Sequence, residues 1–476
     1  MKFVFFHKNY CFIQLALALL LISNTIEAEC LYSNNQVLRV IVGDEYRFDI
    51  DIYNTFKIHK EKIATINQFG VLKAKKKGVT RLTFKDNNGI YYSLKVIVLP
   101  QKKISMQGNF PILAWYSLQE DVSRERFIEL SDAGFNLSFS YATDSIVPQM
   151  EKAAKSAVNT GVRLILPFRG TWVDVEPIIH KFIDSDVLWG WYIADEPSLE
   201  KMSAVKAFMD KIRVYDKKHP FYVNLLPTYA DSSLLGGNYL NYVTKYVELI
   251  KPSFISFDHY PVTYSGLRKD FYKNLSIVSS ISRDNNIPFW AFACSVQYSG
   301  SVPPPRLEHL KFEVFTALAF GAQGIQYFTY TTPRKVHGGN HFWNAPIDRT
   351  AQKTPTYYWV KEVNSRVRSL EKYFLGAEVK TLGYIGVKDL YGIEKFDIQK
   401  LPKCIQSVSC SGTVLISILK NCNSQLLAIV NTSYEESLSF RINSPIGLNK
   451  IAIDGQKESV SPIEVIPPGE MLLYSF

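Results

Sequence analysis

The stretch from Phe135 to Phe168, FNLSFSYATDSIVPQMEKAAKSAVNTGVRLILPF, contains one complete strand–helix–strand repeat. Its two ends, Phe135–Ala142 and Val162–Phe168, are short apolar runs that favour buried strands. Between them, Val147–Thr160 places apolar residues at roughly helical spacing, and Gly161 follows where a helix would end. This order of elements is typical of an α/β fold with a parallel sheet.

The same alternation continues through residues 104–377. A further helix is expected at Ser123–Ala133, with Gly134 just past its end. The sequence predicts eight strands: Pro111–Ser117, Phe135–Ala142, Val162–Phe168, Trp189–Ala194, Phe221–Leu226, Phe254–His259, Pro288–Ala293 and Gly324–Tyr330. Eight strand–helix pairs predict a (β/α)8 TIM barrel. The alternative is an open, doubly wound sheet, which would usually carry fewer strands.

Two regions flank the predicted barrel, and both read as strands and turns. In residues 29–103, turn signals such as Asn87-Asn88-Gly89 separate strand-like runs, which predicts a small β-sandwich. The run Ile63–Gly78 resembles bacterial group-2 Ig-like domains, and this resemblance implies an accessory module. Residues 378–476 contain further strand-like runs, including Thr413–Ile418 and Leu426–Val430, and predict a second β-sandwich without a catalytic cluster.

Residues 1–28 have the pattern of a signal peptide. Lys2 and Lys8 give a basic start, Phe12–Ile22 is an apolar run, and Ile26-Glu27-Ala28 is a suitable cleavage site. The apolar run is too short for a comfortable membrane span. We therefore expect a bacterial protein that is secreted, periplasmic or on the cell surface. A retained anchor and lipidation at Cys30 are the alternatives.

The charge balance does not point to a nucleic-acid enzyme. Lys and Arg number 54 against 44 Asp and Glu, a net charge of +10, and residues 29–103 hold 14 of the former against 7 of the latter. The sequence shows neither zinc-finger spacing nor a Gly-rich phosphate loop. The basic run Lys73–Lys77 suits either contact with an anionic surface or a solvated face.

The cysteines suggest no metal site, and no metal or organic cofactor is expected. Five cysteines follow residue 28: Cys30, Cys294, Cys404, Cys410 and Cys422. No pair of them has metal-ligand spacing. The last three lie near one another in sequence, so export would permit one local disulfide there.

In a barrel of this kind the active site lies at the carboxyl ends of the strands. The most specific signal is the end of strand four, GWYIADEP at residues 190–197. It resembles the barrel glycoside hydrolases that carry Asn/Asp-Glu-Pro at this place, which implies that Glu196 is the general acid/base. We expect the barrel interior and Asp195 to raise the pKa of Glu196. The alternative is that Asp195 or Glu196 caps a helix that begins near Ser198.

The other strand ends and loops carry residues suited to a carbohydrate substrate. Aromatic rings bury the apolar faces of sugars, and polar side chains bind hydroxyl groups. All seven tryptophans lie within residues 104–377. The predicted substrate-binding residues are Trp115, Tyr116, Arg169, Trp172, Asn224, His259, Tyr260, Tyr330 and Trp343.

The second catalytic group is less obvious. The resemblance implies a nucleophile Glu at the end of strand seven, yet Phe289–Gln297 contains no acidic residue. Three interpretations follow. Asp258 acts as nucleophile or base; Glu308 or Glu313 reaches into the site; or a 2-acetamido group of the substrate supplies the nucleophile. In the last case Asp195 accepts a hydrogen bond from the acetamido N–H.

These features predict a secreted glycoside hydrolase that acts on oligo- or polysaccharides. A carbohydrate-binding pseudoenzyme on the same barrel is the main rival, because the strand-seven carboxylate is missing. A structural cell-surface protein is a third interpretation, which rests on the two β-sandwiches alone.

Overall fold

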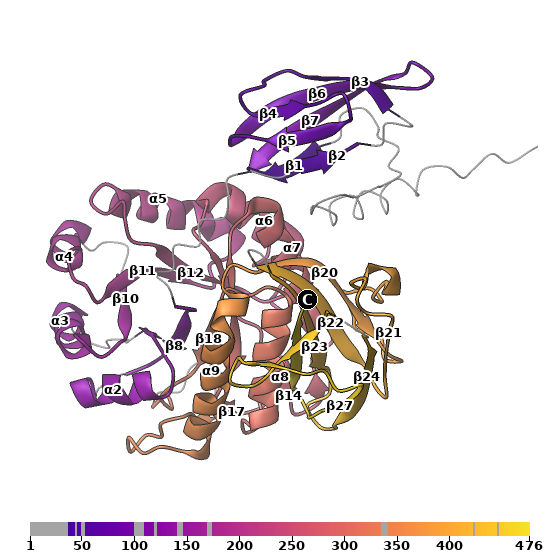
Figure 1. The fold of residues 1–476 in the computed structure, drawn as a ribbon. Coiled ribbons are helices and arrows are strands. Elements are labelled where there is room, and N and C mark those ends of the chain that lie inside the picture. Colours follow the sequence, from indigo (N-terminus) through magenta and orange to yellow (C-terminus); the bar gives the residue numbers. More distant parts are fainter. Residues whose placement is uncertain are drawn as a thin grey trace, which may run out of the picture. The chain divides into compact units, whose positions relative to one another are not determined.

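The computed structural model describes residues 37–42, 45–48, 53–99, 109–118, 121–139, 146–168, 174–334, 341–421, 424–444 and 447–476. The predicted signal peptide lies outside these residues, as do Arg169, Trp172, Cys30 and Cys422. Strands β1 to β7 belong to one compact unit, and strands β8 to β28 belong to a second (Figure 1).

The first unit has two β-sheets. One has the order β1 (Val37–Ile41), β7 (Tyr91–Leu99), β6 (Gly78–Asp86) and β3 (Tyr53–Ile58); the other has the order β2 (Glu45–Arg47), β5 (Val71–Ala74) and β4 (Ala64–Ile66). Leu82 and Phe84 of β6 alternate with more exposed residues and join Leu72 of β5 in one core. This alternation produces a two-sheet unit, and its likeness to Ig-like domains stays a prediction.

The second unit contains a closed barrel of eight parallel strands. They are β8 (Ile112–Trp115), β9 (Leu137–Ser138), β10 (Arg163–Pro167), β11 (Leu188–Asp195), β12 (Phe221–Leu225), β13 (Ile255–Phe257), β16 (Phe289–Cys294) and β18 (Gly324–Phe328). The last strand pairs with the first, since Ile325 of β18 is in register with Ile112 of β8. The closed ring confirms the predicted barrel and excludes the open sheet.

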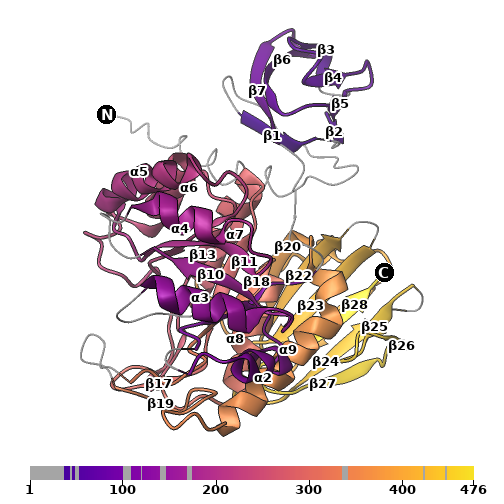
Figure 2. The same ribbon diagram turned by 90° about the vertical axis from the view of Figure 1, so that its left-hand side faces the viewer.

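Helices flank the barrel (Figures 1 and 2). They are α2 (Arg124–Asp132), α3 (Ile146–Ala157), α4 (Val175–Phe182), α5 (Met202–Arg213), α6 (Tyr239–Ile250), α7 (Phe271–Asn285), α8 (Leu307–Ala319) and α9 (Pro355–Phe374). Ser123 caps α2 by accepting a hydrogen bond from the Arg126 N–H. Gly134 follows α2 at φ +87°, and a Cβ there would lie 2.6 Å from the Cβ of Asn364. No helix in the described part of the chain is long and apolar enough to span a membrane.

Large aromatic side chains fill the barrel at the amino ends of its strands. Trp189, Phe254 and Trp290 pack together, with ring centroids 4.3 Å apart for Phe254–Trp290 and 5.1 Å for Trp189–Trp290. Trp191 is also buried and donates from its indole N–H to Asp216 at 2.7 Å. These three tryptophans therefore serve the core and do not belong to a sugar-binding surface.

The C-terminal region adds two antiparallel sheets to the same unit. One has the order β20 (Glu378–Ile385), β22 (Val414–Asn421), β23 (Ser424–Asn431), β28 (Met471–Ser475), β25 (Asn449–Ile451) and β26 (Lys457–Glu458); the other has the order β21 (Ser407–Cys410), β24 (Leu438–Asn443) and β27 (Ile463–Ile466). Side chains of both sheets share one core. Cys404 and Cys410 carry free thiols, so neither takes part in the disulfide considered for this region.

Candidate active site

Glu196 directly follows β11, at the carboxyl end of the barrel. Its backbone has φ +46°, a left-handed conformation that non-glycine residues rarely adopt, and its N–H donates to the Asn224 carbonyl at 2.9 Å. The helical turn that follows begins after Ser198 and α5 begins after Lys201, with no side-chain cap at either start. The capping alternative for Asp195 and Glu196 is therefore wrong.

Three carboxyl groups meet at this end of the barrel. Asp195 accepts a hydrogen bond from the Asn224 amide at 3.2 Å. Glu196 shares a hydrogen bond with Asp258, which comes just after β13. Asp258 is buried, with 8% of its surface exposed, and its Oδ1 has no hydrogen-bond partner among the described residues. The structure thus brings together all three residues predicted to be catalytic.

Crowding of three acids alters their protonation. Burial and the charge of Glu196 raise the pKa of Asp195, and the hydrogen bond from Asn224 lowers it. The net result is a pKa of about 7. Burial also raises the pKa of Glu196, and the hydrogen bond from Asp258 partly offsets this rise. Burial with the charges of Glu196 and Asp195 raises the pKa of Asp258 well above its usual range. Asp195 and Glu196 keep solvent-exposed surface although protein atoms crowd around them, so water weakens the effect of burial on these two and Asp258 is the most strongly affected. At neutral pH the cluster therefore retains a proton that it can donate.

An aromatic layer lies beside the carboxyl cluster. Trp115, at the end of β8, packs against Phe139 at 5.3 Å and Phe328 at 5.7 Å between ring centroids, and its indole N–H has no partner among the described residues. Tyr260, two residues after Asp258, packs against Phe328 at 5.3 Å. Two of the predicted substrate-binding residues thus share one aromatic wall at the mouth.

Tyr229 is a site residue that the sequence did not reveal. It lies in the loop after β12, is 40% exposed, and contacts the His259 ring edge-to-face at 4.9 Å. The Arg268 guanidinium lies 4.2 Å from the centre of the Tyr229 ring. Although part of the ring is exposed, protein atoms crowd around Tyr229, and this desolvation together with the nearby charge of Asp258 raises its pKa. Its position a few residues past the end of strand five was the one available signal.

Other predicted substrate contacts lie elsewhere. Tyr330 is fully buried, and its hydroxyl donates to Glu129 of α2 at 3.1 Å, which places its side chain outside the barrel wall. His259 is buried, with its Nε2 3.4 Å from Asp270. Trp343 is 42% exposed on β19 (Phe342–Trp343), which pairs with β17 (Gln297–Tyr298). Tyr330 does not join the carboxyl cluster.

The two glutamates considered as alternative nucleophiles also lie apart from the cluster. Glu313 is buried on α8 near Tyr327, and its carboxylate accepts the Cys294 N–H at 2.6 Å. Glu308 is part-exposed at the start of α8, with its carboxylate 4.0 Å from Arg306. Glu313 thus accepts a backbone hydrogen bond at the end of strand seven from the side of α8, and it does not face the barrel mouth.

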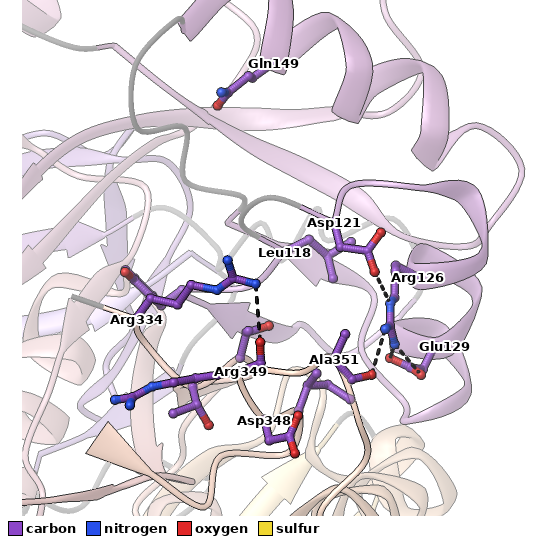
Figure 3. Close-up of a pocket in the computed structure, with 13 residues that line it drawn as sticks. Leu118, Asp121, Arg126, Glu129, Gln149, Arg334, Asp348, Arg349 and Ala351 are labelled. Atoms are coloured by element: carbon purple, nitrogen blue, oxygen red, sulfur yellow. Dashed lines mark hydrogen bonds and ion pairs between the residues drawn. The ribbon is translucent and has the colours of Figure 1, made fainter. Parts of the chain in front are cut away.

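A separate pocket of about 90 Å³ opens between the ends of β8 and β18 and helix α2 (Figure 3). Three of its charged residues pair with one another, since Arg126 binds Asp121 at 2.7 Å and Glu129 at 3.0 Å. Tyr116 lines this pocket, whereas the three carboxyl groups of the cluster do not. Within the described ranges, no group of His, Cys, Asp and Glu side chains is arranged to hold a metal ion.

Comparison with known proteins supports a glycoside hydrolase. A glycoside hydrolase family 42 model, described as β-galactosidase, matches residues 183–370, which include all three carboxyl residues. No curated protein sequence matches the chain. The chain resembles a catalytic mutant of the GH42 β-galactosidase Gan42B from G. stearothermophilus at 10% identity, with a TM-score of 0.53 over 78% of this chain and 98% of that one.

A second solved structure is less similar. The β-galactosidase of the psychrophilic Marinomonas ef1 has 10% identity and a TM-score of 0.41, and the match covers 55% of this chain and 60% of that one. The likeness to Gan42B establishes the barrel fold, and the family match makes this chain a glycoside hydrolase.

Proposed function

We propose that this chain hydrolyses O-glycosidic bonds with Glu196 as the general acid/base. The observation that supports this role is the placement of Glu196 beside Asp258 at the barrel mouth, where burial raises the pKa of Glu196 more than the hydrogen bond from Asp258 lowers it. A protonated Glu196 donates to the leaving oxygen as the glycosidic bond breaks, and the resulting carboxylate then takes a proton from the incoming water.

The spacing of the carboxyl groups bears on the nucleophile. In the two-carboxylate mechanisms the groups stand about 5–5.5 Å apart in retaining enzymes and about 6.5–9.5 Å apart in inverting ones. Glu196 and Asp258 lie close enough to change each other's protonation, which favours a shared-proton pair over two carboxylates on opposite sides of a sugar carbon. The end of strand seven offers Cys294 and Ser295, neither of which is acidic.

A substrate with a 2-acetamido group would supply the nucleophile that the protein lacks. Its carbonyl oxygen forms a bond to the anomeric carbon while the glycosidic C–O bond breaks, and Glu196 gives its proton to the departing oxygen. Asp195, in its ionised form, accepts the acetamido N–H and steadies the cyclic cation. Water then attacks the anomeric carbon and gives a proton to the Glu196 carboxylate, while the bond from the acetamido oxygen to that carbon breaks and restores the acetamido group. Asp258 in this scheme keeps the shared proton available to Glu196.

Two other functions remain to be separated by experiment. The family model and the solved structures carry the name β-galactosidase, and a galactoside lacks the acetamido group, so it would need Asp258 as nucleophile. The non-acidic end of strand seven would also suit a carbohydrate-binding pseudoenzyme.

The deciding experiment compares aryl β-galactosides with aryl 2-acetamido-2-deoxy-β-glycosides. Wild type should hydrolyse the acetamido substrates, and Glu196→Gln should lose about 10²–10⁴-fold in rate. Glu200→Gln removes an exposed carboxyl four residues away and should leave the rate unchanged. Undiminished turnover in Glu196→Gln would refute the acid/base role. Hydrolysis of galactosides alone would refute substrate assistance, and no hydrolysis by folded protein would favour the binding protein.

We also propose export from a bacterial cell, on the basis of the signal-like residues 1–28. Contact of the first unit with an anionic surface is part of the same proposal. Lys75, Lys76 and Lys77 are exposed, while Lys73 pairs with Glu45 at 3.1 Å. Binding of the secreted protein to anionic and neutral polysaccharide at two salt concentrations tests that contact.

A further inference from the structure

A line of hydrogen bonds, with side contacts from Ser256 to Tyr222 and to the Gln326 oxygen, runs through the barrel interior and ends on Asp195. Tyr222 donates to the Gln326 carbonyl oxygen at 2.5 Å, and the Gln326 amide donates to the Ser256 hydroxyl at 3.0 Å. Ser256 donates to the Asn224 carbonyl oxygen at 2.9 Å, and the Asn224 amide donates to Asp195 at 3.2 Å. The first four side chains are at most 2% exposed.

Strand register accounts for this row. Asp195 of β11 is directly opposite Asn224 of β12, and Asn224 is directly opposite Ser256 of β13. Adjacent strands of a barrel therefore present these three side chains side by side. Gln326 of β18 and Tyr222 of β12 reach the row from other parts of the wall.

The direction of the line follows from the donors that each group possesses. A side-chain amide has one oxygen, which only accepts, and one NH₂, which only donates. The Tyr222 proton occupies the Gln326 oxygen, so the Gln326 NH₂ faces Ser256. Ser256 also lies 3.1 Å from the Tyr222 hydroxyl, but its shortest bond, at 2.9 Å, goes to the Asn224 oxygen. The Asn224 NH₂ is thereby left to face Asp195.

We infer that Ser256 and Gln326 are positioning residues that act on Asp195 by holding the Asn224 amide with its NH₂ toward that carboxylate. Neither residue needs to touch substrate. The inference rests on the proposed function, in which ionised Asp195 receives the acetamido N–H. Without the line of bonds, the Asn224 amide is free to turn and present its oxygen to Asp195, which would repel the ionised form.

The titratable groups around Asp195 make this bond important. Glu196 follows Asp195 in the turn after β11, and Asp258 follows β13. The charge of Asp195 also reaches the hydroxyls of Tyr222 and Tyr242. Both acids and both tyrosines favour the neutral form of Asp195 when they are charged. Among the described residues that act on Asp195, Asn224 is the group that favours its ionised form.

The test is the pH dependence of kcat/KM for an aryl 2-acetamido glycoside in wild type and Ser256→Ala. We expect about a tenfold loss at neutral pH, the worth of one buried hydrogen bond, and a shift of the acid limb to higher pH with KM nearly unchanged. The sign follows because removal of a donor raises the pKa of the carboxyl that must be ionised. Ser256→Thr keeps the hydroxyl, so the acid limb of its kcat/KM profile should lie at the same pH as in wild type.

Ser279→Ala is the matched control. Ser279 is equally buried on α7, and its hydroxyl donates to the Phe320 carbonyl at 2.7 Å. It should lower the thermal midpoint without moving the limb. If Ser256→Ala does not fold, Gln326→Met breaks the line one bond earlier and should shift the limb in the same direction. A folded variant with the wild-type profile, or with a loss of rate and no shift, overturns the inference. Activity that survives Glu196→Gln overturns the proposed function instead.

Discussion

The carboxyl groups of Glu196 and Asp258 share a hydrogen bond at the barrel mouth, although one follows β11 and the other follows β13 with a whole strand between them. The left-handed backbone of Glu196 belongs to the turn that sets its side chain there. Two acids in such contact hold a proton between them, because both cannot ionise cheaply in a crowded site. In the proposed mechanism this pair supplies the acid that glycoside cleavage requires.

Asp258→Asn should retain turnover. The amide still donates to Glu196 but can no longer carry a negative charge, so Glu196 should ionise at lower pH and the alkaline limb of the rate profile should move down. Rates measured across that limb check the shift. Two results together would identify Asp258 as a nucleophile. They are complete loss of activity in Asp258→Asn and, in wild type treated with a 2-fluoro glycoside, a covalent adduct on Asp258 found by peptide mass mapping.

The same substitution should stabilise the protein at neutral pH. The folded state raises the pKa of Asp258, so between its unfolded and folded pKa values the folded protein binds more protons and the free energy of unfolding falls as pH rises. Asp258→Asn removes this titrating group, so the free energy of unfolding should no longer fall with pH on its account. Its thermal midpoint should exceed that of wild type near pH 8 and approach it near pH 4. An equal or lower midpoint near pH 8 contradicts the raised pKa.

Asp195 and Glu196 should fail in different ways. Glu196→Gln removes the proton donor and should slow substrates with poor leaving groups most. Asp195→Asn removes an acceptor and should slow every acetamido substrate by a similar factor, whatever its leaving group. A series of aryl glycosides with graded leaving groups measures both slopes. Identical slopes for the two variants would contradict their separate roles.

Tyr229→Ala should weaken substrate binding. Its exposed ring beside His259 offers an apolar face to a sugar, so we expect KM to rise about tenfold with little change in kcat. Tyr229→Phe keeps the ring and should behave like wild type. Tyr358→Ala removes a more exposed tyrosine from α9 and serves as the control. An unchanged KM in Tyr229→Ala would exclude the ring from the sugar site.

The sequence predicted the barrel because its strands are continuous apolar runs, and it predicted Asp195, Glu196 and Asp258 because acidic residues at the ends of such runs are conspicuous. It did not predict the contact between Glu196 and Asp258, since a positive φ at a non-glycine residue leaves no mark in the sequence. Tyr330 was assigned to the mouth by its place after a strand, but the chain turns its side chain toward α2.

Residues buried in strands or placed on loops gave weaker signals. Ser256 and Gln326 are single polar residues within apolar strands, and only strand register reveals that they share one line of bonds. Trp189 and Trp290 were counted among the seven tryptophans of residues 104–377 without an assigned role, and both fill the barrel floor. Tyr229 lies on a loop without periodicity, so its place beside His259 depends on tertiary structure.

Glu196-driven, substrate-assisted cleavage is tested most directly by varying the acyl group of the substrate. The measurement is kcat/KM for aryl glycosides that carry acetamido, monofluoroacetamido, difluoroacetamido or trifluoroacetamido groups. Each fluorine withdraws electrons from the carbonyl oxygen that attacks the anomeric carbon, so the account predicts a steady, steep fall in rate across the series. Equal rates with all of these substrates would contradict it and return the nucleophile to a protein carboxylate.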